Sequence, residues 1–426
     1  MSAASFKERV QMEFDAASAS LPGKVLPLAS RRSAVARLMD LGLPALRDDA
    51  WRYANLRPLQ SVHLRSVSPD AAVDFDSTGL RLGAPLPGAI RLVFVDGRLD
   101  ATASSSVAER SRLRELPPAI QSAERPADTR FALLNDAFAV DAARYGIDGE
   151  CTLELVFVSG AAGTVSSYPR VQLEVAAAAR LTLIERHLGG GSPEVLSSAV
   201  TELGLSRDAH CRWYRIQDLA VTATHLDTLR VRLEAGATLE AVLVQLGGGA
   251  VRTHLDCELA GRAAAVQLQA ASLAGDSRTL DSSIHVRHLA ADTRSQQELR
   301  AIATDRASIS FRSGVCIGPA APGADSRQSL KGLIGGDGAE VNLRPELEID
   351  VDSVRASHGA TTGAIDEAML FYLLSRGLDR QTARQLLEWA FVETVIGKVQ
   401  EPAVRREFEE RTVARLGNRA ALEVLA

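Results

Sequence analysis

The middle of the chain contains short alternating strands, several of which begin with an alanine after a polar or glycine corner. Three of these alanines stand at positions 209, 237 and 264, so they are 28 and then 27 residues apart. Ala307 and Ala339 repeat the pattern at less regular spacing. A loose period of this size is typical of a solenoid, whose turns cannot bury an apolar face alone and therefore stack to share a core. We predict a parallel β-helix over roughly residues 150–350.

A β-sandwich is the alternative fold, because many short strands separated by polar turns also suit that architecture. No segment with a helical period interrupts the strand region, which argues against a doubly wound α/β fold. Residues 1–150 contain helical patterns and a short strand at 90–95. We therefore expect a mainly helical N-terminal domain with a short strand segment over 1–150, a β-helix core over 151–350 and a helical C-terminal domain over 351–426.

Charge and cysteine usage argue against several classes of protein. The formal net charge is −5, whereas proteins that bind nucleic acid usually carry a clustered basic excess. The four cysteines are far apart and form no CxxC pair, so neither a disulfide framework nor a structural zinc site is expected. No run of about 18 apolar residues is present, and residues 1–14 lack the apolar stretch of a signal peptide. We expect a cytoplasmic protein that binds neither nucleic acid nor a membrane.

The sequence lacks the common motifs for nucleotide binding and hydrolysis. No lysine stands in a GxxxxGK[ST] loop, and no GxSxG elbow occurs. The glycines between 332 and 338 precede a strand rather than a helix, so a turn is favoured over a Rossmann phosphate loop. β-helices also host carbohydrate-active enzymes, and spacing along the sequence does not reveal whether two carboxylates converge. A carbohydrate-active β-helix enzyme and a self-associating β-helix structural protein are therefore kept as alternative functions.

Two pairs of residues are candidates for metal binding. His285 and His288 are three residues apart, which suits chelation on a helix but places the side chains on opposite faces of a strand. His210 and Cys211 are adjacent, so on a strand they also point apart. In both pairs we favour a structural role with one side chain buried and the other exposed. The cysteines are expected to act as small buried side chains.

A further candidate, His358, lies where the strand region gives way to the C-terminal helices. Its neighbours Ser357, Gly359 and Ala360 are small, so another chain can approach closely. An imidazole at this junction can serve as a metal ligand or as a proton carrier. Residue chemistry by itself favours a structural role, and the ligand role stays open beside it.

Two blocks of sequence carry a family resemblance. The N-terminal block is Gly42-Leu43-Pro44 with Trp51-Arg52-Tyr53-Ala54-Asn55-Leu56. The C-terminal block comprises Arg344-Pro345-Glu346-Leu347-Glu348-Ile349, Ser357-His358-Gly359-Ala360-Thr361, Ile365-Asp366, Leu370-Phe371-Tyr372-Leu373 and Ser375-Arg376-Gly377-Leu378. These blocks resemble the SufB/SufD family of iron–sulfur cluster assembly scaffold proteins. The glycine after the histidine, in place of the glutamate usual in SufB, favours the SufD branch, and the resemblance extends over nearly the whole chain.

The resemblance implies a right-handed parallel β-helix flanked by helical domains and a non-catalytic role as a scaffold subunit. Such a subunit pairs with a SufB-like chain through β-helix edges, and its C-terminal helices dock onto a SufC-like ABC ATPase that supplies the nucleotide chemistry. In isolation the chain could pair with a second copy. On this chain the residues implied in docking the ATPase are Leu370, Phe371, Arg376, Leu386, Trp389 and Phe391.

The resemblance also implies a role for His358. The matching histidine lies near the SufB–SufD interface, where a transient iron–sulfur cluster forms with a SufB cysteine, and no cofactor is tightly bound by this chain alone. Many family members carry a cysteine two residues before that histidine, whereas this chain has Ala356. A cluster or metal ligand from this motif would therefore be His358 itself, or this chain contributes little to cluster binding.

Overall fold

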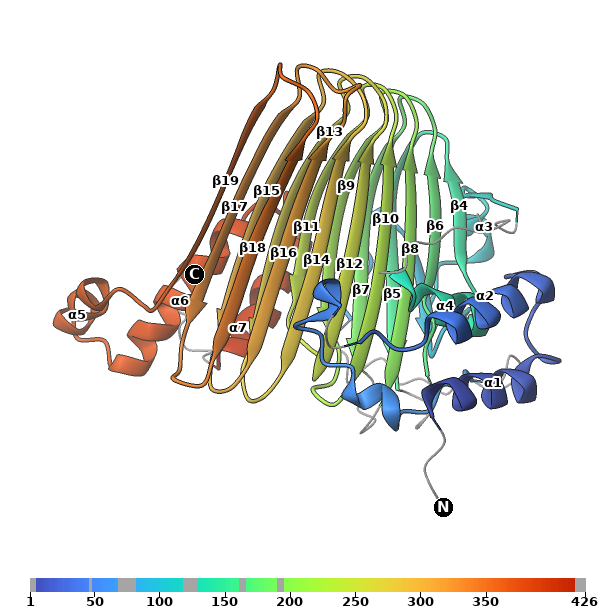
Figure 1. Cartoon of the computed structure of the whole chain (residues 1–426), viewed down its shortest axis with the longest axis horizontal. Coiled ribbons are helices and arrows are strands. Elements are labelled where there is room, and N and C mark those ends of the chain that lie inside the picture. Colours follow the sequence, from blue (N-terminus) through green and yellow to red (C-terminus); the bar gives the residue numbers. More distant parts are fainter. Residues whose placement is uncertain are drawn as a thin grey trace.

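The computed structural model describes residues 5–45, 48–67, 82–117, 129–160, 166–189 and 195–417. Its central feature is a solenoid made of two sheets that face each other (Figure 1). Successive strands alternate between the sheets, so each turn adds one strand to each sheet. From β4 and β5 onward the neighbours within each sheet are parallel. The predicted parallel β-helix with helices at both ends is confirmed.

The two sheets differ in length by one strand. The ten-stranded sheet contains β1 (Ile90–Val95), β2 (Arg98–Asp100), β5 (Glu150–Ser159), β7 (Arg180–Gly189), β9 (His210–Asp218), β11 (Thr238–Gln245), β13 (Ala265–Ala274), β15 (Arg294–Ala303), β17 (Asp325–Ile334) and β19 (Arg355–Gly363). The nine-stranded sheet contains β3 (Arg114–Glu115), β4 (Ala143–Ile147), β6 (Arg170–Val175), β8 (Leu196–Leu205), β10 (Thr224–Leu233), β12 (Ala250–Leu259), β14 (Thr279–His288), β16 (Ser308–Ile317) and β18 (Glu340–Ile349).

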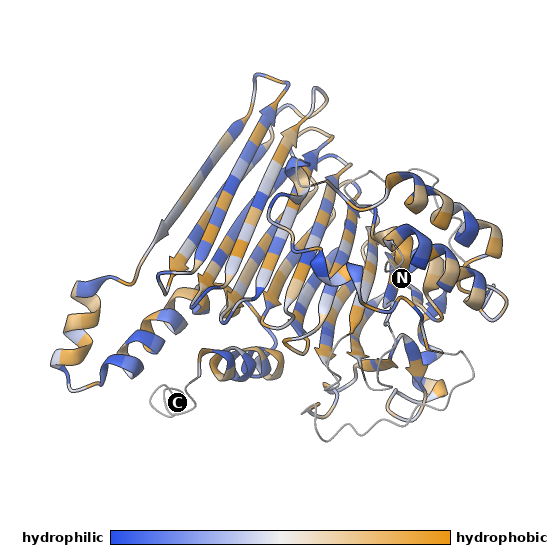
Figure 2. Ribbon diagram, turned by 60° about the horizontal axis from the view of Figure 1, so that its bottom comes forward, coloured by the Kyte–Doolittle hydropathy of each residue, from blue (hydrophilic) through white to orange (hydrophobic). Residues whose placement is uncertain are grey.

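Alternating side chains from both sheets fill the space between them. Along β13, Val266 and Leu268 are buried in this shared core, whereas Gln267 is exposed. Figure 2 shows the same alternation of hydrophobic and hydrophilic residues along the strands. Burying one Val or Leu side chain stabilises the fold by roughly 1.5–3 kcal/mol. Because the core is continuous from turn to turn, each turn depends on its neighbours for that gain.

Each turn enters the ten-stranded sheet through a corner in which a left-handed residue precedes a small buried one. The left-handed residues, with φ between +58° and +77°, are Ala178, Asp208, Gly236, Ala263, Asp292 and Gly323. The small residues that follow are at most 4% exposed, and they are Ala179, Ala209, Ala237, Ala264, Thr293 and Ala324. Ala307 and Ala339 precede strands of the nine-stranded sheet instead. Their irregular spacing in the sequence arises because they belong to the opposite corner of the solenoid.

The N-terminal helices pack against the outer face of the nine-stranded sheet (Figure 1). They are α1 (Phe6–Ala17), α2 (Leu28–Leu41) and α4 (Ala132–Phe138), with the shorter α3 (Val107–Arg110), η1 (Asp49–Trp51) and η2 (Arg57–Gln60). Asn135 of α4 donates hydrogen bonds of 2.7 Å to the backbone carbonyls of Pro169 and Ser198. Trp51 packs between the guanidinium groups of Arg130 and Arg252. The N-terminal motif around Trp51 therefore ties this segment to the solenoid.

The C-terminal helices are α5 (Glu367–Ser375), α6 (Arg380–Ile396) and α7 (Pro402–Leu416). Helices α6 and α7 lie on the outer face of the ten-stranded sheet, where Val392 and Phe408 are fully buried in a core that includes Tyr214 and Val242 of the strands. Asp379 caps α6, because its side chain accepts from the backbone N–H of Thr382. Helix α5 projects beyond the end of the solenoid (Figure 1).

Two predictions about the whole chain are not settled by these elements. The division into domains at residues 150 and 350 stays a prediction, and the strands run past both positions: β1 and β4 precede residue 150, and β19 follows residue 350. Across the described ranges, none of the helices combines the length and the apolar character needed to cross a lipid bilayer. The cytoplasmic location stays a prediction.

Candidate functional site

The C-terminal end of the solenoid is a terminal rung with two open edges. Among the strands that the structure describes, β18 pairs with β16 only, and β19 pairs with β17 only. Each of these strands therefore presents one row of backbone groups that bond to no further strand of the two sheets. Such edges are templates for a strand from another chain.

The two open edges differ in what they offer a further strand. At the two ends of β18 the N–H groups of Glu340 and Asp350 donate to the carbonyls of Ala307 and Ile317, on the side of β16. The backbone groups of the alternate residues, Pro345 among them, therefore face the open edge. Proline has no N–H and is typical of edges that resist strand addition. On β19 the N–H of Arg355 donates to the carbonyl of Ala324, so the backbone N–H groups of residues 356, 358, 360 and 362 point to the open edge. None of these four residues is proline. The β19 edge therefore keeps its full row of donors.

The predicted ligand His358 lies on β19 at this terminal rung. Its register partner is Gln328 of β17, whose side chain is 5% exposed and belongs to the interior. Since no rung follows, the side chain of His358 is exposed. Ala356 lies on the same face and pairs with Ser326. The structure thus places His358 at the open end of the interior, and its role as a ligand stays a prediction.

The six residues predicted to dock an ATPase are not all on the surface. Phe371 is 71% exposed and Arg376 is exposed, whereas Leu370 and Trp389 are buried at 3% and 9%. Trp389 packs in the core between α6 and the ten-stranded sheet, and Leu386 and Phe391 are half-buried. The sequence pattern of α6 did not reveal which of these residues are buried, because the buried face of a helix depends on where the neighbouring sheet lies.

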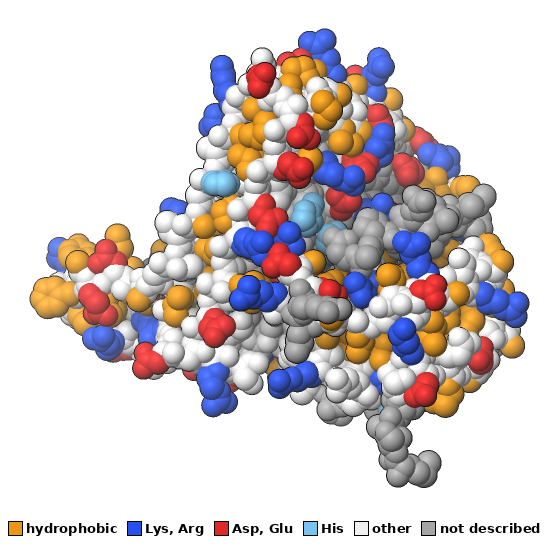
Figure 3. Space-filling model, viewed as in Figure 1, with side chains coloured by type: hydrophobic (Ala, Val, Ile, Leu, Met, Phe, Trp, Pro, Cys, Tyr) orange, Lys and Arg blue, Asp and Glu red, His pale blue; other side chains and the backbone are white. Residues whose placement is uncertain are grey.

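The exposed part of α5 includes two residues that were not among the six predicted docking residues. Met369 and Tyr372 are 59% and 57% exposed, and the guanidinium group of Arg376 lies 5.1 Å from the Tyr372 ring. Together with Phe371 they form what we call the α5 surface, defined as Met369, Phe371, Tyr372 and Arg376. Figure 3 shows hydrophobic side chains gathered at this end of the molecule. Exposed apolar patches of this kind mark protein interaction sites.

The two candidate metal pairs are split as predicted. His288 is fully buried and its ring nitrogens bond to Thr293 and Ser295, whereas His285 lies on the outer face and is partly exposed. Cys211 is fully buried and His210 is partly exposed. Within the ranges that the structure describes, no three His, Cys, Asp or Glu residues are grouped so that they could hold a metal ion.

The interior of the solenoid contains an ionic cluster that the sequence-based prediction missed. We call it the interior cluster, and its members are Glu185, His187, Arg215, His225 and Asp227. Each is at most 3% exposed. Arg215 lies 3.2 Å from a Glu185 carboxylate oxygen and 2.9 Å from an Asp227 oxygen. The sequence does contain a signal for this cluster, namely charged residues at positions that face inward on successive strands. Which positions face inward is known only once the strand register is known.

Burial and neighbouring charges move the pKa values of the interior cluster in opposite directions. Burial raises the pKa of Asp227 to about 7, and Arg215 offsets only part of that rise. Glu185 is equally buried, yet Arg215 and His187 outweigh burial and lower its pKa to about 2. Burial, with Arg215, lowers the pKa of His187 to about 4, and burial also lowers that of His225. At neutral pH both imidazoles are therefore uncharged.

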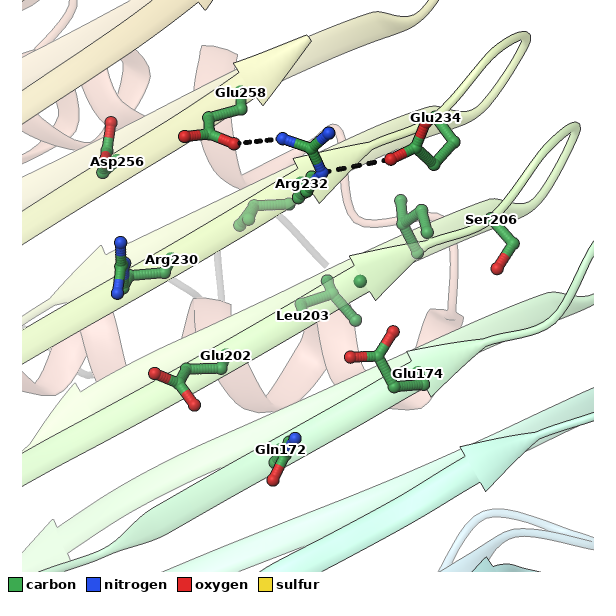
Figure 4. Close-up of a pocket in the computed structure, with 13 residues that line it drawn as sticks. Gln172, Glu174, Glu202, Leu203, Ser206, Arg230, Arg232, Glu234, Asp256 and Glu258 are labelled. Carbon is green, nitrogen blue, oxygen red and sulfur yellow. Dashed lines mark hydrogen bonds and ion pairs between the residues drawn. The ribbon is translucent and has the colours of Figure 1, made fainter. Parts of the chain in front are cut away.

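A charged groove lies on the outer face of the nine-stranded sheet. One section, of about 510 Å³, is lined by Glu174, Glu202, Arg230, Arg232, Glu234, Asp256 and Glu258 (Figure 4). A second section, of about 480 Å³, shares Asp256 and includes His285, Arg287, Cys316 and Glu348. Arg232 pairs with Glu258 at 2.6 Å, and Arg287 pairs with Asp256 at 2.7 Å. The groove is therefore largely a ladder of ion pairs across strands.

Glu174 is the carboxyl of this groove that bears on the carbohydrate-active alternative. Burial, together with the nearby charge of Glu202, raises its pKa. A raised pKa beside a second carboxyl is a feature that glycosidases use. The pair of Glu174 and Glu202 is therefore consistent with a carbohydrate-active β-helix enzyme.

The fold and the terminal rung define a class of protein: a parallel β-helix with helical ends, whose candidate site combines open strand edges with an exposed apolar helix. Residues 157–391 match the family model described as SUF system FeS cluster assembly, SufBD core domain. The match covers more than half of the chain. The chain belongs to the SufBD family of iron–sulfur cluster assembly proteins.

Similarity to individual relatives supports the same family. The chain is 26% identical over 393 residues to the iron–sulfur cluster assembly protein SufD of Escherichia coli (strain K12), covering 90% of each protein. It is 26% identical over 383 residues to an iron–sulfur cluster assembly SufBD family protein of Mycobacterium tuberculosis, covering 85% of this chain and 87% of the relative. Similarity to SufB of Bacillus subtilis is 29% over 198 residues and covers 46% and 43%. The SufD alignment therefore spans nearly the whole chain, and the SufB alignment less than half.

Proposed function

We propose that this chain is a non-catalytic, SufD-like scaffold subunit that pairs with a SufB-like subunit and a SufC-like ABC ATPase during iron–sulfur cluster assembly. Family membership supports the general role. The observation that supports the specific assembly is the terminal rung, where an open strand edge, His358 and the projecting α5 surface occur at one end of the molecule.

The SufB-like subunit adds to the β19 edge in this proposal. That edge keeps its full row of backbone donors, whereas Pro345 interrupts the row on β18. A strand on β19 brings the second chain beside His358. The nascent cluster is the cargo of this interface, with His358 as the ligand from this chain and a cysteine from the SufB-like subunit. A second copy of this chain can use the same edge, so a homodimer of the isolated protein would be consistent with the proposal.

The α5 surface is where the ATPase binds in this proposal. Apolar and aromatic groups next to an arginine are typical of the residues that dominate binding energy at interfaces. Helix α5 packs on α6, and α6 packs on β11, β13 and β15. Trp389 lies within that packed layer, so its role is to link the helices to the solenoid. Movement of the ATPase can be transmitted by this route to the ten-stranded sheet that contains β19.

Co-purification tests the assembly, and a point substitution locates the ATPase contact. Phe371→Asp is expected to lower retention of the co-expressed SufC-like ATPase about tenfold or more, because it removes an aromatic anchor and adds a charge to the interface. Met12→Asp is the matched control, since Met12 is 61% exposed on α1, far from α5 in the sequence. Equal retention by both variants would place the ATPase elsewhere, and failure of all three wild-type chains to co-purify would overturn the assembly.

Cluster content of the purified complex tests the ligand role. His358→Ala is expected to leave the complex assembled but to lower bound iron and sulfide about tenfold or more, since even the loss of a residue that supports a metal ligand costs about 10–100-fold in affinity. His285→Ala is the control, because His285 lies on the outer face of β14, in the nine-stranded sheet, whereas His358 lies on β19 of the ten-stranded sheet. Unchanged iron and sulfide in the His358 variant would remove this residue from the proposed interface chemistry.

A further inference from the structure

Three consecutive turns place polar residues in one interior column that ends at His358. The strand register runs from Leu268 of β13 to Gln297, then to Gln328, and then to His358. Gln297 and Gln328 are 1% and 5% exposed. Burying an amide costs free energy unless its polar atoms are hydrogen-bonded. The cost of this column therefore depends on the partners of each amide.

The orientation of the Gln328 amide follows from its hydrogen bonds. Its Nε2 donates to the backbone carbonyl of Ser313 at 2.8 Å and to the Ser313 hydroxyl at 2.9 Å. A carbonyl oxygen only accepts, so the nitrogen must be the atom on that side. The Ser313 hydroxyl in turn donates to Oε1 of Gln297 at 2.5 Å. Within the described part of the chain, the Gln328 carbonyl oxygen, Oε1, is left as a buried acceptor without a donor.

The residues around this acceptor leave His358 as the donor on the open side. Across the interior, the residue that follows Ser313 in the ladder is Pro345, which has no N–H. The adjacent column offers Ser326, whose oxygen accepts from Ser295 and whose O–H does not donate to the Gln328 oxygen, and then Ala356, which has no polar side-chain atom. Neighbouring parallel strands are about 4.8 Å apart, a spacing over which an imidazole N–H can reach an amide oxygen in the next turn.

We propose that Gln328 is a positioning residue that accepts a hydrogen bond from one ring N–H of His358 and so selects a single imidazole tautomer. The other ring nitrogen then directs its lone pair toward the open end of the solenoid. Histidines that bind metals are commonly held in this way by a carbonyl or carboxylate behind the ring. The inference rests on the proposed function for its purpose, but the hydrogen bond itself does not require a cluster or a second chain.

Nitrogen NMR of the full-length chain, labelled at histidine, tests the hydrogen bond directly. The His358 signals are assigned by their loss in His358→Asn. At pH 8 we expect one tautomer of His358 to predominate in the wild type, and Gln328→Leu to change the tautomer ratio roughly fivefold, the effect of a net hydrogen bond of average strength. Ser326→Ala is the control, because it also removes a buried polar group from β17 but faces Ala356.

The outcomes separate this inference from the proposed function. A mixed tautomer in the wild type, which needs no variant to fold, would overturn the inference and would mean that Gln297 Nε2 satisfies the Gln328 oxygen instead. An equal change in Gln328→Leu and Ser326→Ala would also overturn it. If a single tautomer is found but His358→Ala leaves the cluster content of the co-expressed complex unchanged, the positioning contact stands and the ligand role fails.

Discussion

Replacing Arg215 with alanine is expected to lower the free energy of unfolding by about 3–5 kcal/mol, the usual cost of breaking a buried ion pair by removing one partner. Arg215 is 3% exposed and bridges Glu185 and Asp227, whose side chains are fully buried. Without it, two carboxyls remain in the interior with no cation between them. Asp227 already has a pKa raised to about 7 by burial, so it would bind a proton, but Glu185 would lose its main counter-charge.

Equilibrium unfolding in urea, followed by circular dichroism, measures this loss. Arg114→Ala is the matched control, because Arg114 makes hydrogen bonds of 2.9 and 3.1 Å to Asp148, yet both side chains are more than half exposed. Solvent screens that surface pair, so its removal is expected to have a much smaller effect. Similar losses in the two variants would show that burial does not make the interior cluster important for stability.

Lowering the pH from 6.5 to 4 is expected to destabilise the protein through its buried histidines. Burial lowers the pKa of His187 and of His288 to about 4, and it also lowers that of His225. A histidine whose folded pKa lies below its unfolded value stabilises the fold fully above pH 6.5 and loses that contribution as the pH falls toward the folded pKa. With one pKa unit equal to about 1.4 kcal/mol, each imidazole of this kind accounts for roughly 3 kcal/mol.

The carboxyl of Asp227 opposes this loss of stability, so its contribution to the free energy of unfolding must be added to those of the histidines. The pKa of Asp227 is raised to about 7, so its protonation favours the folded state as the pH falls. Three imidazoles outweigh one carboxyl, and the net effect between pH 6.5 and 4 is a loss of stability. Below the usual pKa of a glutamate, the lowered pKa of Glu185 adds a further loss, because its ionised form is the one bound by Arg215.

Urea midpoints measured between pH 7.5 and 4.5 test the histidine contribution. His288→Asn is the informative variant, because His288 lies apart from the interior cluster and bonds to Thr293 and Ser295. This variant is expected to be less stable at pH 7.5 but to lose less stability than the wild type on acidification. An identical pH slope in the two proteins would contradict the assignment of acid sensitivity to the buried imidazoles.

The repeat was readable from the sequence because its signal is local. A small residue such as Ala237 follows a left-handed residue at the corners that enter the ten-stranded sheet, and apolar residues alternate along the strands of the core, whatever the neighbouring turns contain. The same is true of the motif that contains His358. The period looked irregular only because Ala307 belongs to a second corner, which cannot be distinguished from the first before the strands are assigned to sheets.

The candidate site was only partly readable from the sequence, because only part of its signal is local. The motif located His358 and α5, but burial divided the six predicted docking residues, leaving Phe371 exposed and Trp389 inside the packed layer. Whether Trp389 faces a sheet or solvent depends on where α6 lies against the ten-stranded sheet, and no local pattern of the helix contains that information.

By itself, therefore, the sequence determined the solenoid, its flanking helices and its family, since these follow from short-range spacing and from matching blocks of residues. Only the tertiary structure decided which strand edge stays open to another chain, which charges meet around Arg215, and that Gln328 and His358 are neighbours in the strand register. The physical reason is the register between neighbouring parallel strands, which pairs residues about 30 positions apart in the sequence. A shift of this register by one residue would turn each of these side chains to the opposite face of its sheet.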